Sequence, residues 1–198
     1  PSLGGIELKV DDWGIDAIYS GSQKCLSCVP GISPVSFSDR AVSLIQNRKT
    51  KVQSWFLDMN LIVGYWGSGA KRAYHHTAPV NSMYAMYESL LMLREEGLEN
   101  AWQRHQRGHE ALAQGLEALN LTLAVDKNYR LPQLNVVEIP SGVNDADVRQ
   151  RLLNEFNLEI GAGLGEFAGK VWRIGLMGYA CKPRNIDHCL AALKQVLK

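Results

Sequence analysis

Apolar side chains recur at every third or fourth position along the stretch from residue 80 to residue 119. This spacing predicts an amphipathic helix, because such positions fall on one helix face. Gly97 interrupts the pattern, so we expect the helix to break or kink there. We also expect a domain boundary at this glycine, with one unit at residues 1–96 and a second at residues 97–198.

Short apolar runs and polar segments alternate after this helix. The runs at 121–125 and 131–140 predict strands, and 158–177 predicts two short strands around a glycine-rich loop. Residues 144–157 and 182–198 have helical spacing. This order predicts a compact α+β unit in which helices cover one face of a mostly antiparallel sheet.

Shorter elements are expected before the long helix. Residues 8–19 predict two strands around the turn "DDWG", and residues 33–38 predict another strand. A helix at 38–48 follows, with a serine or an aspartate as its cap. The segment 54–67 is strongly apolar and aromatic, and it predicts a buried or interfacial helix that ends near Gly67.

The composition is that of an ordinary globular protein, with 46% hydrophobic and 21% charged residues in a chain of 198. The formal net charge is +1, which gives no electrostatic reason to expect binding to nucleic acid or to an anionic membrane. No apolar run approaches the length of a membrane span. We therefore expect neither nucleic acid nor a membrane as a partner.

The chain has four cysteines, and Cys25 and Cys28 form a C-x-x-C pair. Such a pair is typical of a redox site or of half a zinc site. Cys181 and Cys189 lie in a distant segment and lack the spacing of the remaining zinc ligands. We interpret all four as small buried thiols in a reducing compartment, the cytoplasm, and we expect no metal site.

Lys24 lies between small polar residues and a Pro-Gly turn in "YSGSQKCLSCVPG", without a charged residue beside it. A lysine held among small residues can lose its proton and attack a carbonyl carbon, which forms a Schiff base. Ser22 and Gln23 offer hydrogen bonds to a cofactor in the same segment. Considered alone, Lys24 also fits an ordinary surface lysine.

Two hydroxyl side chains flank a pair of adjacent histidines in "RAYHHTAP". Tyr74 and Thr77, close to Lys71 and Arg72, have the chemistry to hold a phosphate. Alternatively, Thr77 and Pro79 mark the start of a helix. The two histidines are not expected to bind a metal together, because neighbouring side chains in a loop rarely point the same way and no third ligand has metal spacing.

Arg173 interrupts the apolar strand "KVWRIGLMG". Strand alternation puts Trp172 and Ile174 on one face and Arg173 on the other, together with Val171 and Gly175. An arginine that faces a core needs a partner. Arg173 is therefore either a two-point clamp for a carboxylate ligand or an edge-strand residue that reaches solvent, and the local pattern favours the two equally.

Five segments occur in an order that closely resembles the class V pyridoxal-phosphate aminotransferases of the alanine–glyoxylate / serine–pyruvate family. The segments are "YSGSQKCLSCVPG", "RAYHHTAP", "EEGLENAWQRH", "YRLPQLNVVEIP" and "GLGEFAGKVWRIGLMG". The resemblance covers essentially the whole chain, and S-x-Q-K and Y-H-H-T are its more specific parts. It implies the α/β architecture of fold type I, a homodimer with active sites at the subunit interface, and pyridoxal 5'-phosphate as the cofactor.

The resemblance also implies roles for five residues. Lys24 would form the Schiff base with the cofactor, and Gln23 would contact the cofactor phosphate. Tyr74 and Thr77 would reach the phosphate of the partner subunit's cofactor, and Arg173 would bind the α-carboxylate of the substrate. The implied reaction moves an amino group from a small amino acid, alanine or serine, to glyoxylate or pyruvate.

Three alternatives remain at this stage. By resemblance, residues 1–96 are the last part of the large cofactor domain and residues 97–198 are a complete small domain. The other cofactor-binding residues of the family are therefore expected upstream. The first alternative is that the chain alone is an inactive fragment that dimerises through "SWFLDMNLIVGYW". The second is a ureidoglycine as the amino donor. A class V lyase or desulfurase is the third alternative, with Cys181 as its only candidate loop cysteine.

Overall fold

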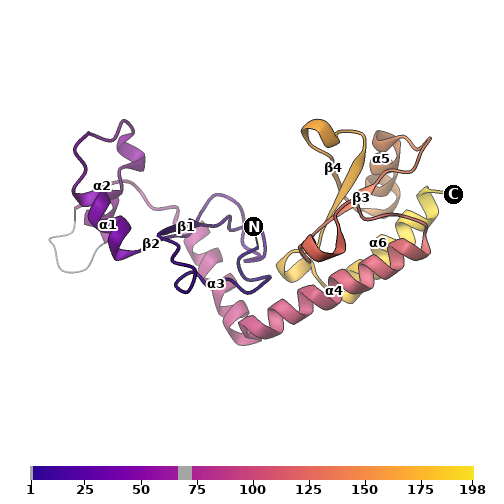
Figure 1. Ribbon diagram of the computed structural model, residues 1–198, viewed down its shortest axis with the longest axis horizontal. Coiled ribbons are helices and arrows are strands. Elements are labelled where there is room, and N and C mark those ends of the chain that lie inside the picture. The colour runs from indigo at the N-terminus through magenta and orange to yellow at the C-terminus, as the bar shows by residue number, and fades with distance from the viewer. Residues whose placement is uncertain (1, 67–72) are drawn as a thin grey trace.

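A computed structural model describes residues 2–66 and 73–198 of the chain. The chain is elongated, with the first two helices at one end and a helix-covered sheet at the other (Figure 1). The N-terminus, a two-stranded sheet and the start of the longest helical region lie between them.

The first half of the described chain contains a small antiparallel sheet and short helices. Strands β1 and β2 pair with each other, in agreement with the alternating pattern of residues 33–38. Ser38 caps the helix that follows, because its Oγ accepts a hydrogen bond from the Ala41 N–H at 3.2 Å. The elements are β1 (Ala17–Tyr19), β2 (Val35–Phe37), α1 (Asp39–Gln46), the 3₁₀ helix η1 (Trp55–Leu57) and α2 (Met59–Trp66).

The long helical pattern folds as two helices, α3 (Val80–Glu96) and α4 (Leu98–Ala118). Gly97 separates them with a φ of 85°, a backbone angle that glycine adopts without steric cost. The predicted break at Gly97 is confirmed. The change of direction lets α3 pack beside the segment that contains Lys24, while α4 runs beneath the sheet of the second half (Figure 1).

The second half is built on a three-stranded antiparallel sheet with the order β3-β5-β4. Helices α4, α5 and α6 cover one face, as the alternation of elements predicts, and the core between them includes Leu112, Leu152, Trp172 and Leu193. The elements are β3 (Leu134–Glu138), α5 (Asp145–Phe156), β4 (Gly161–Ala162), β5 (Val171–Gly175), α6 (Pro183–Val196) and the 3₁₀ helices η2 (Lys127–Tyr129), η3 (Gly165–Phe167) and η4 (Gly178–Ala180).

Two expected strands are shorter or missing. Residues 8–10 form no strand, and residues 121–125 contribute only an isolated bridge between Leu123 and Val137. The second segment pairs briefly with β3 because Ala124 N–H donates to Val136 O and the chain then turns at Asp126. The apolar residues 121–125 do lie against β3, as their pattern predicts. The turn at Asp126 follows too soon for them to form a full strand.

The aromatic segment around η1 is not buried within the chain. Trp55, Phe56 and Leu57 are 57%, 56% and 66% exposed. The expectation of a buried helix is therefore wrong for these three residues, while its interfacial alternative stays a prediction. No helix within the described residues is long and apolar enough to cross a membrane.

Candidate functional site

Lys24 lies in a loop that follows β1 and is closed by its own hydrogen bonds. Ser22 is fully buried, and its Oγ donates to Val29 O at 2.7 Å while its carbonyl accepts from Cys28 N–H at 3.0 Å. Lys24 O accepts from Ser27 N–H at 2.9 Å. The half-buried Lys24 side chain has no hydrogen-bond or ion-pair partner within residues 2–66 and 73–198. The hydrogen bonds of the loop thus hold the backbone around Lys24 in a turn, and the side-chain amine has no partner among the described residues.

Gln23 lies beside Lys24 and folds back over Gly21. A Cβ on Gly21 would lie 2.8 Å from Gln23 Oε1 and 3.7 Å from Lys24 Cγ. A side chain at position 21 would therefore displace the Gln23 amide. The glycine leaves room for the Gln23 and Lys24 side chains in one narrow turn, with the exposed Gln23 amide beside the Lys24 side chain.

Tyr74 and Thr77 bring their hydroxyl groups together, with 2.6 Å between Tyr74 Oη and Thr77 Oγ1. Both side chains are exposed. Thr77 does not cap α3, because Pro79 occupies the cap position and no side chain closes it. The predicted helix start is confirmed, since α3 begins directly after Pro79, but the predicted cap by Thr77 is wrong, and Tyr74 and Thr77 present two hydroxyls to solvent. Lys71 and Arg72 lie outside the described residues.

His75 and His76 lie between Tyr74 and Thr77, and His75 connects this segment to η1. His75 Nδ1 lies 2.7 Å from His76 Nδ1, and His75 Nε2 lies 3.1 Å from Trp55 O. The buried His75 ring stacks on the Trp55 ring with 3.9 Å between centroids. The expectation that the two imidazoles point apart is wrong. No group of three possible metal ligands occurs among the described residues.

Arg173 projects from β5, which is the central strand of the sheet, so the edge-strand alternative is wrong. Its Nε donates to Ala162 O at 2.7 Å, and no acidic side chain in the described part of the chain pairs with it. Gly161 lies opposite, and a Cβ there would stand 3.3 Å from Nη2. The remaining N–H groups of the guanidinium are therefore available to an acceptor such as a carboxylate.

The structure does not bring all candidate residues into contact. Among the described residues, no hydrogen bond or ion pair joins Lys24, Tyr74 and Arg173 to one another. Two local groups form instead, Gln23 with Lys24 and Tyr74 with Thr77, while Arg173 stands apart on β5. A shared site would require the chain to meet further protein segments at these surfaces.

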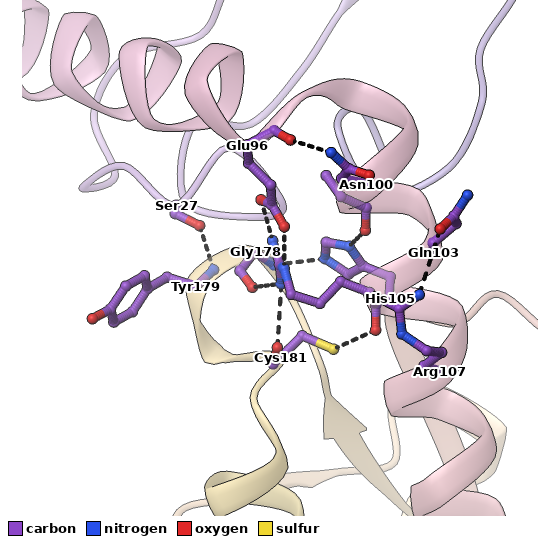
Figure 2. A network of polar contacts seen from close by, with 11 residues as sticks. Ser27, Glu96, Asn100, Gln103, His105, Arg107, Gly178, Tyr179 and Cys181 are labelled. Atoms are coloured by element: carbon purple, nitrogen blue, oxygen red, sulfur yellow. Dashed lines mark hydrogen bonds and ion pairs between the residues drawn. The ribbon is translucent and has the colours of Figure 1, made fainter.

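A polar network that the local sequence patterns did not indicate connects the Lys24 loop to the end of β5 (Figure 2). Arg104 forms a two-point ion pair with Glu96, with distances of 2.5 and 2.8 Å. Its Nη1 also donates to Gly178 O at 2.6 Å. The hydrogen bond from Arg104 lowers the pKa of the Glu96 carboxyl and raises that of the guanidinium. In the sequence, this ion pair is indicated only by the opposite charges of Glu96 and Arg104 on either side of the predicted break at Gly97.

His105 is the buried member of the network. Its Nδ1 donates to Ala101 O at 2.6 Å, and its Nε2 accepts from Gly178 N–H at 2.9 Å. These partners require the neutral imidazole with its proton on Nδ1. Burial lowers the pKa of His105, which favours the same form.

All four cysteines are free and buried, as predicted. Cys181 Sγ donates to Arg104 O at 3.6 Å, and burial raises the pKa of this thiol. A nucleophilic cysteine needs an accessible thiolate, so this environment disfavours the desulfurase alternative. Burial likewise raises the pKa of Cys25.

The donor groups fit the cofactor that the sequence suggests. Pyridoxal phosphate has an aldehyde, which reacts with a free amine, and a phosphate, which accepts hydrogen bonds from amides and hydroxyls. Lys24 provides an amine that has no partner among the described residues, Gln23 the adjacent amide, and Tyr74 with Thr77 the paired hydroxyls. Arg173 provides a guanidinium without an acidic partner among the residues described, which suits a carboxylate substrate.

Comparisons with known proteins agree with these features. The family model described as aminotransferase class-V matches residues 2–181. The chain is 44% identical over 199 residues to alanine–glyoxylate aminotransferase of Rattus norvegicus, covering 100% of the chain and 48% of the relative. It is 37% identical over 214 residues to (S)-ureidoglycine–glyoxylate transaminase of Bacillus subtilis, covering 99% and 51%. The crystal structure of alanine–glyoxylate aminotransferase from Nostoc sp. matches with a TM-score of 0.96 at 53% identity, covering 100% of this chain and 52% of that one. The chain spans about half the length of the curated relatives it matches.

Proposed function

Because this chain belongs to the class-V aminotransferases, we propose that it forms part of a pyridoxal-phosphate enzyme that moves an amino group from alanine or serine to glyoxylate or pyruvate. Its fold is that of the fold type I aminotransferases. The observation that carries the proposal is the Lys24 amine, which is unpaired within the described chain and held beside Gln23 in a closed loop.

The cofactor would be held by side chains from two segments. Bound pyridoxal phosphate supplies an aldehyde for covalent attachment and an aromatic ring that withdraws electrons from the substrate Cα. Lys24 would attach it through Nζ, and the Gln23 amide would donate to its phosphate. The Tyr74 and Thr77 hydroxyls, 2.6 Å apart, would donate to the phosphate held by a partner subunit.

Arg173 would orient the substrate. Its guanidinium donates from Nε to Ala162 O, and its other N–H groups have no hydrogen-bond partner among the described residues. A substrate α-carboxylate would accept from them in the two-point geometry that arginine favours. Because no acidic side chain among the described residues competes for these donors, the clamp would be specific for an anionic ligand.

Lys24 would then move the proton that the reaction requires. With the cofactor bound, Nζ would accept the proton from the substrate Cα as a general base. The same Nζ would return that proton as a general acid. The closed loop would keep Nζ in reach for both transfers.

The exposed aromatic segment supports a homodimer. Trp55, Phe56 and Leu57 form an exposed apolar surface, and Trp55 contacts His75, the residue that follows Tyr74. Apolar and aromatic side chains of this kind are enriched in the centres of subunit interfaces. A second copy packed here would cover them and would carry Tyr74 and Thr77 to its partner's cofactor.

The proposal also covers the domain organisation, the cellular compartment and the amino donor. Residues 1–96 would belong to the large cofactor domain and residues 97–198 would form the small domain, with the boundary at Gly97. The four free thiols favour a reducing compartment such as the cytoplasm. Ureidoglycine is the second candidate donor, because the (S)-ureidoglycine–glyoxylate transaminase of Bacillus subtilis is 37% identical to the chain.

Borohydride reduction tests the central assignment. The protein is incubated with pyridoxal phosphate, reduced and digested, and its peptides are mapped by mass. We expect a phosphopyridoxyl group on Lys24 and none on exposed lysines such as Lys170, and we expect no label in the Lys24→Arg variant. Label spread over surface lysines, or its complete absence, would contradict the proposal. Turnover of alanine, serine and ureidoglycine with glyoxylate then identifies the donor.

A further inference from the structure

We propose that Ser27 is a positioning residue, whose hydroxyl fixes the strand that carries Arg173 relative to Lys24. The inference rests on the function proposed above. It concerns a contact between η4 and the Lys24 loop, two segments that are 152 positions apart where they meet. Figure 2 shows Ser27 on one side of this contact and Gly178, Tyr179 and Cys181 on the other.

The backbone of η4 is held mainly by side chains from other elements. Tyr179 N–H donates to Ser27 Oγ at 2.7 Å, and Gly178 N–H donates to His105 Nε2 at 2.9 Å. Arg104 donates to Gly178 O at 2.6 Å and to Cys181 O at 3.2 Å. Gly178 is buried, so its backbone groups need such partners, and the bond from Tyr179 to Ser27 adds a contact at the exposed edge of η4. Together these side chains determine where η4 lies.

Within this network, Ser27 is the member that belongs to the Lys24 loop. Arg104 and His105 both lie on α4 and connect η4 to that helix. Ser27 N–H donates to Lys24 O, so the Ser27 hydroxyl moves with the backbone of Lys24. Ser27 also has a φ of 60°, an angle that turns its side chain out of the loop toward η4.

The fit between the two segments leaves no free space at Gly178. A Cβ at this position would overlap Ser27 Oγ and would lie 2.8 Å from Cys25 O. The backbone of η4 therefore rests directly on the Lys24 loop, and the hydroxyl bond fixes the register of the contact. A loss of that bond would let the two surfaces slide.

The contact reaches Arg173 through β5. Leu176 N–H donates to Gln133 O at 2.9 Å, which keeps the chain after β5 aligned with β3 up to η4. A shift of η4 would therefore be transmitted to β5 and its arginine. An amino acid joins its amine and its carboxylate through one carbon, so Lys24 and Arg173 must keep a fixed separation to bind both groups.

A comparison of two ligands separates positioning from folding. The holoenzyme is titrated with alanine and with ethylamine, which lacks the carboxylate, and the change in cofactor absorbance gives each dissociation constant. In Ser27→Ala we expect the constant for alanine to rise about five-fold, the equivalent of one hydrogen bond, while that for ethylamine is unchanged. Borohydride should still label Lys24 in the variant.

Two further variants complete the test. Ser20→Ala removes the hydroxyl of a buried serine just before the same loop, one whose hydrogen bond is to Gly21 O and not to η4, and should bind both ligands like the wild type. Ser27→Gly accepts the positive φ and removes the hydroxyl, so it replaces Ser27→Ala should that variant fail to fold. It should show the same selective loss of alanine binding.

The outcomes of the two proposals are distinct. Unchanged alanine binding, or an equal loss for both ligands, in a Ser27 variant whose Lys24 is still labelled would overturn the positioning role alone. Absence of label on Lys24 in the wild type would overturn the proposed function, and the positioning role with it.

Discussion

Arg104 and Glu96 face each other across the break between α3 and α4, where the guanidinium donates two hydrogen bonds to the carboxylate. The same guanidinium binds two carbonyls at η4. One partly buried side chain therefore joins α3, α4 and the segment after β5. This arrangement makes the junction around Gly97 sensitive to single substitutions.

Arg104→Lys should lower the free energy of unfolding by about 2 kcal/mol, because a lysine cannot reproduce the planar set of donors. Urea denaturation measures the change. Arg40→Lys is the matched control, since Arg40 pairs with Asp16 but is 75% exposed, and its loss should be much smaller. Equal losses in the two variants would show that the Arg104 network contributes no more than a surface ion pair.

His105 should make stability depend on pH. Burial holds its pKa below the ordinary value of 6.5, so the folded protein keeps it neutral while the unfolded chain binds a proton. The stabilisation is thus complete above pH 6.5 and decreases as the pH falls below it. Wild type should lose stability as the pH falls from about 6.5 to about 5.5, and His105→Gln should lose less over the same interval. Parallel curves would exclude His105 as the source.

Glu96 acts in a different pH range, which keeps the two effects separable. The hydrogen bond from Arg104 lowers the pKa of Glu96 from its ordinary 4.5. Its stabilisation is present above 4.5 and is lost as the pH falls through the lowered pKa. The interval used for His105 therefore reports little on this carboxylate.

Gly178→Ala should be far more destabilising than Gly142→Ala. Both glycines have positive φ, 55° and 82°, but a Cβ on Gly142 would meet nothing within 4 Å. The backbone strain alone should cost about 1–2 kcal/mol at either position. The overlap with the Lys24 loop should add about 1–3 kcal/mol at Gly178. Thermal or urea unfolding of the pair measures the difference, and similar values would mean that the contact between η4 and the loop is loose.

Local patterns in the sequence predicted the elements that depend on neighbouring residues. The glycine break at Gly97, the Ser38 cap and the alternation of Trp172 with Arg173 all follow from spacing that a single helix or strand imposes. The resemblance implied roles for both Lys24 and Arg173, although separate elements carry them, and these roles stay predictions.

Contacts between distant segments were not predictable in the same way. No periodic pattern in the sequence indicates the hydrogen bond from Tyr179 to Ser27 or the bonds from Arg104 to η4. These bonds depend on how complete helices, strands and loops pack against one another. Thr77 is a residue type that often caps helices, yet its hydroxyl pairs with that of Tyr74. The exposure of Trp55 and Phe56 also could not be read from their apolar character, since it depends on what else packs there.

Arg173→Gln should weaken alanine binding to the holoenzyme about a hundred-fold, because it removes a charged partner of the carboxylate while keeping a polar side chain. Binding of ethylamine, measured from the cofactor absorbance, should be unchanged. Arg130→Gln is the control, because Arg130 donates to Val125 O in a loop away from β5. A Gln variant at 173 that still binds alanine tightly would argue against the clamp.

The hydroxyl pair formed by Tyr74 and Thr77 should set the affinity for the cofactor rather than for the substrate. Tyr74→Phe keeps the ring that contacts Tyr65 but removes the oxygen that lies 2.6 Å from Thr77 Oγ1. If the pair binds phosphate, the dissociation constant for pyridoxal phosphate should rise about ten-fold, while that for pyridoxal, which lacks the phosphate, stays the same. Tyr84→Phe removes an equally exposed hydroxyl from α3 and should change neither constant. Equal weakening of both ligands in Tyr74→Phe would mean that the hydroxyl supports the fold of the segment and does not contact the phosphate.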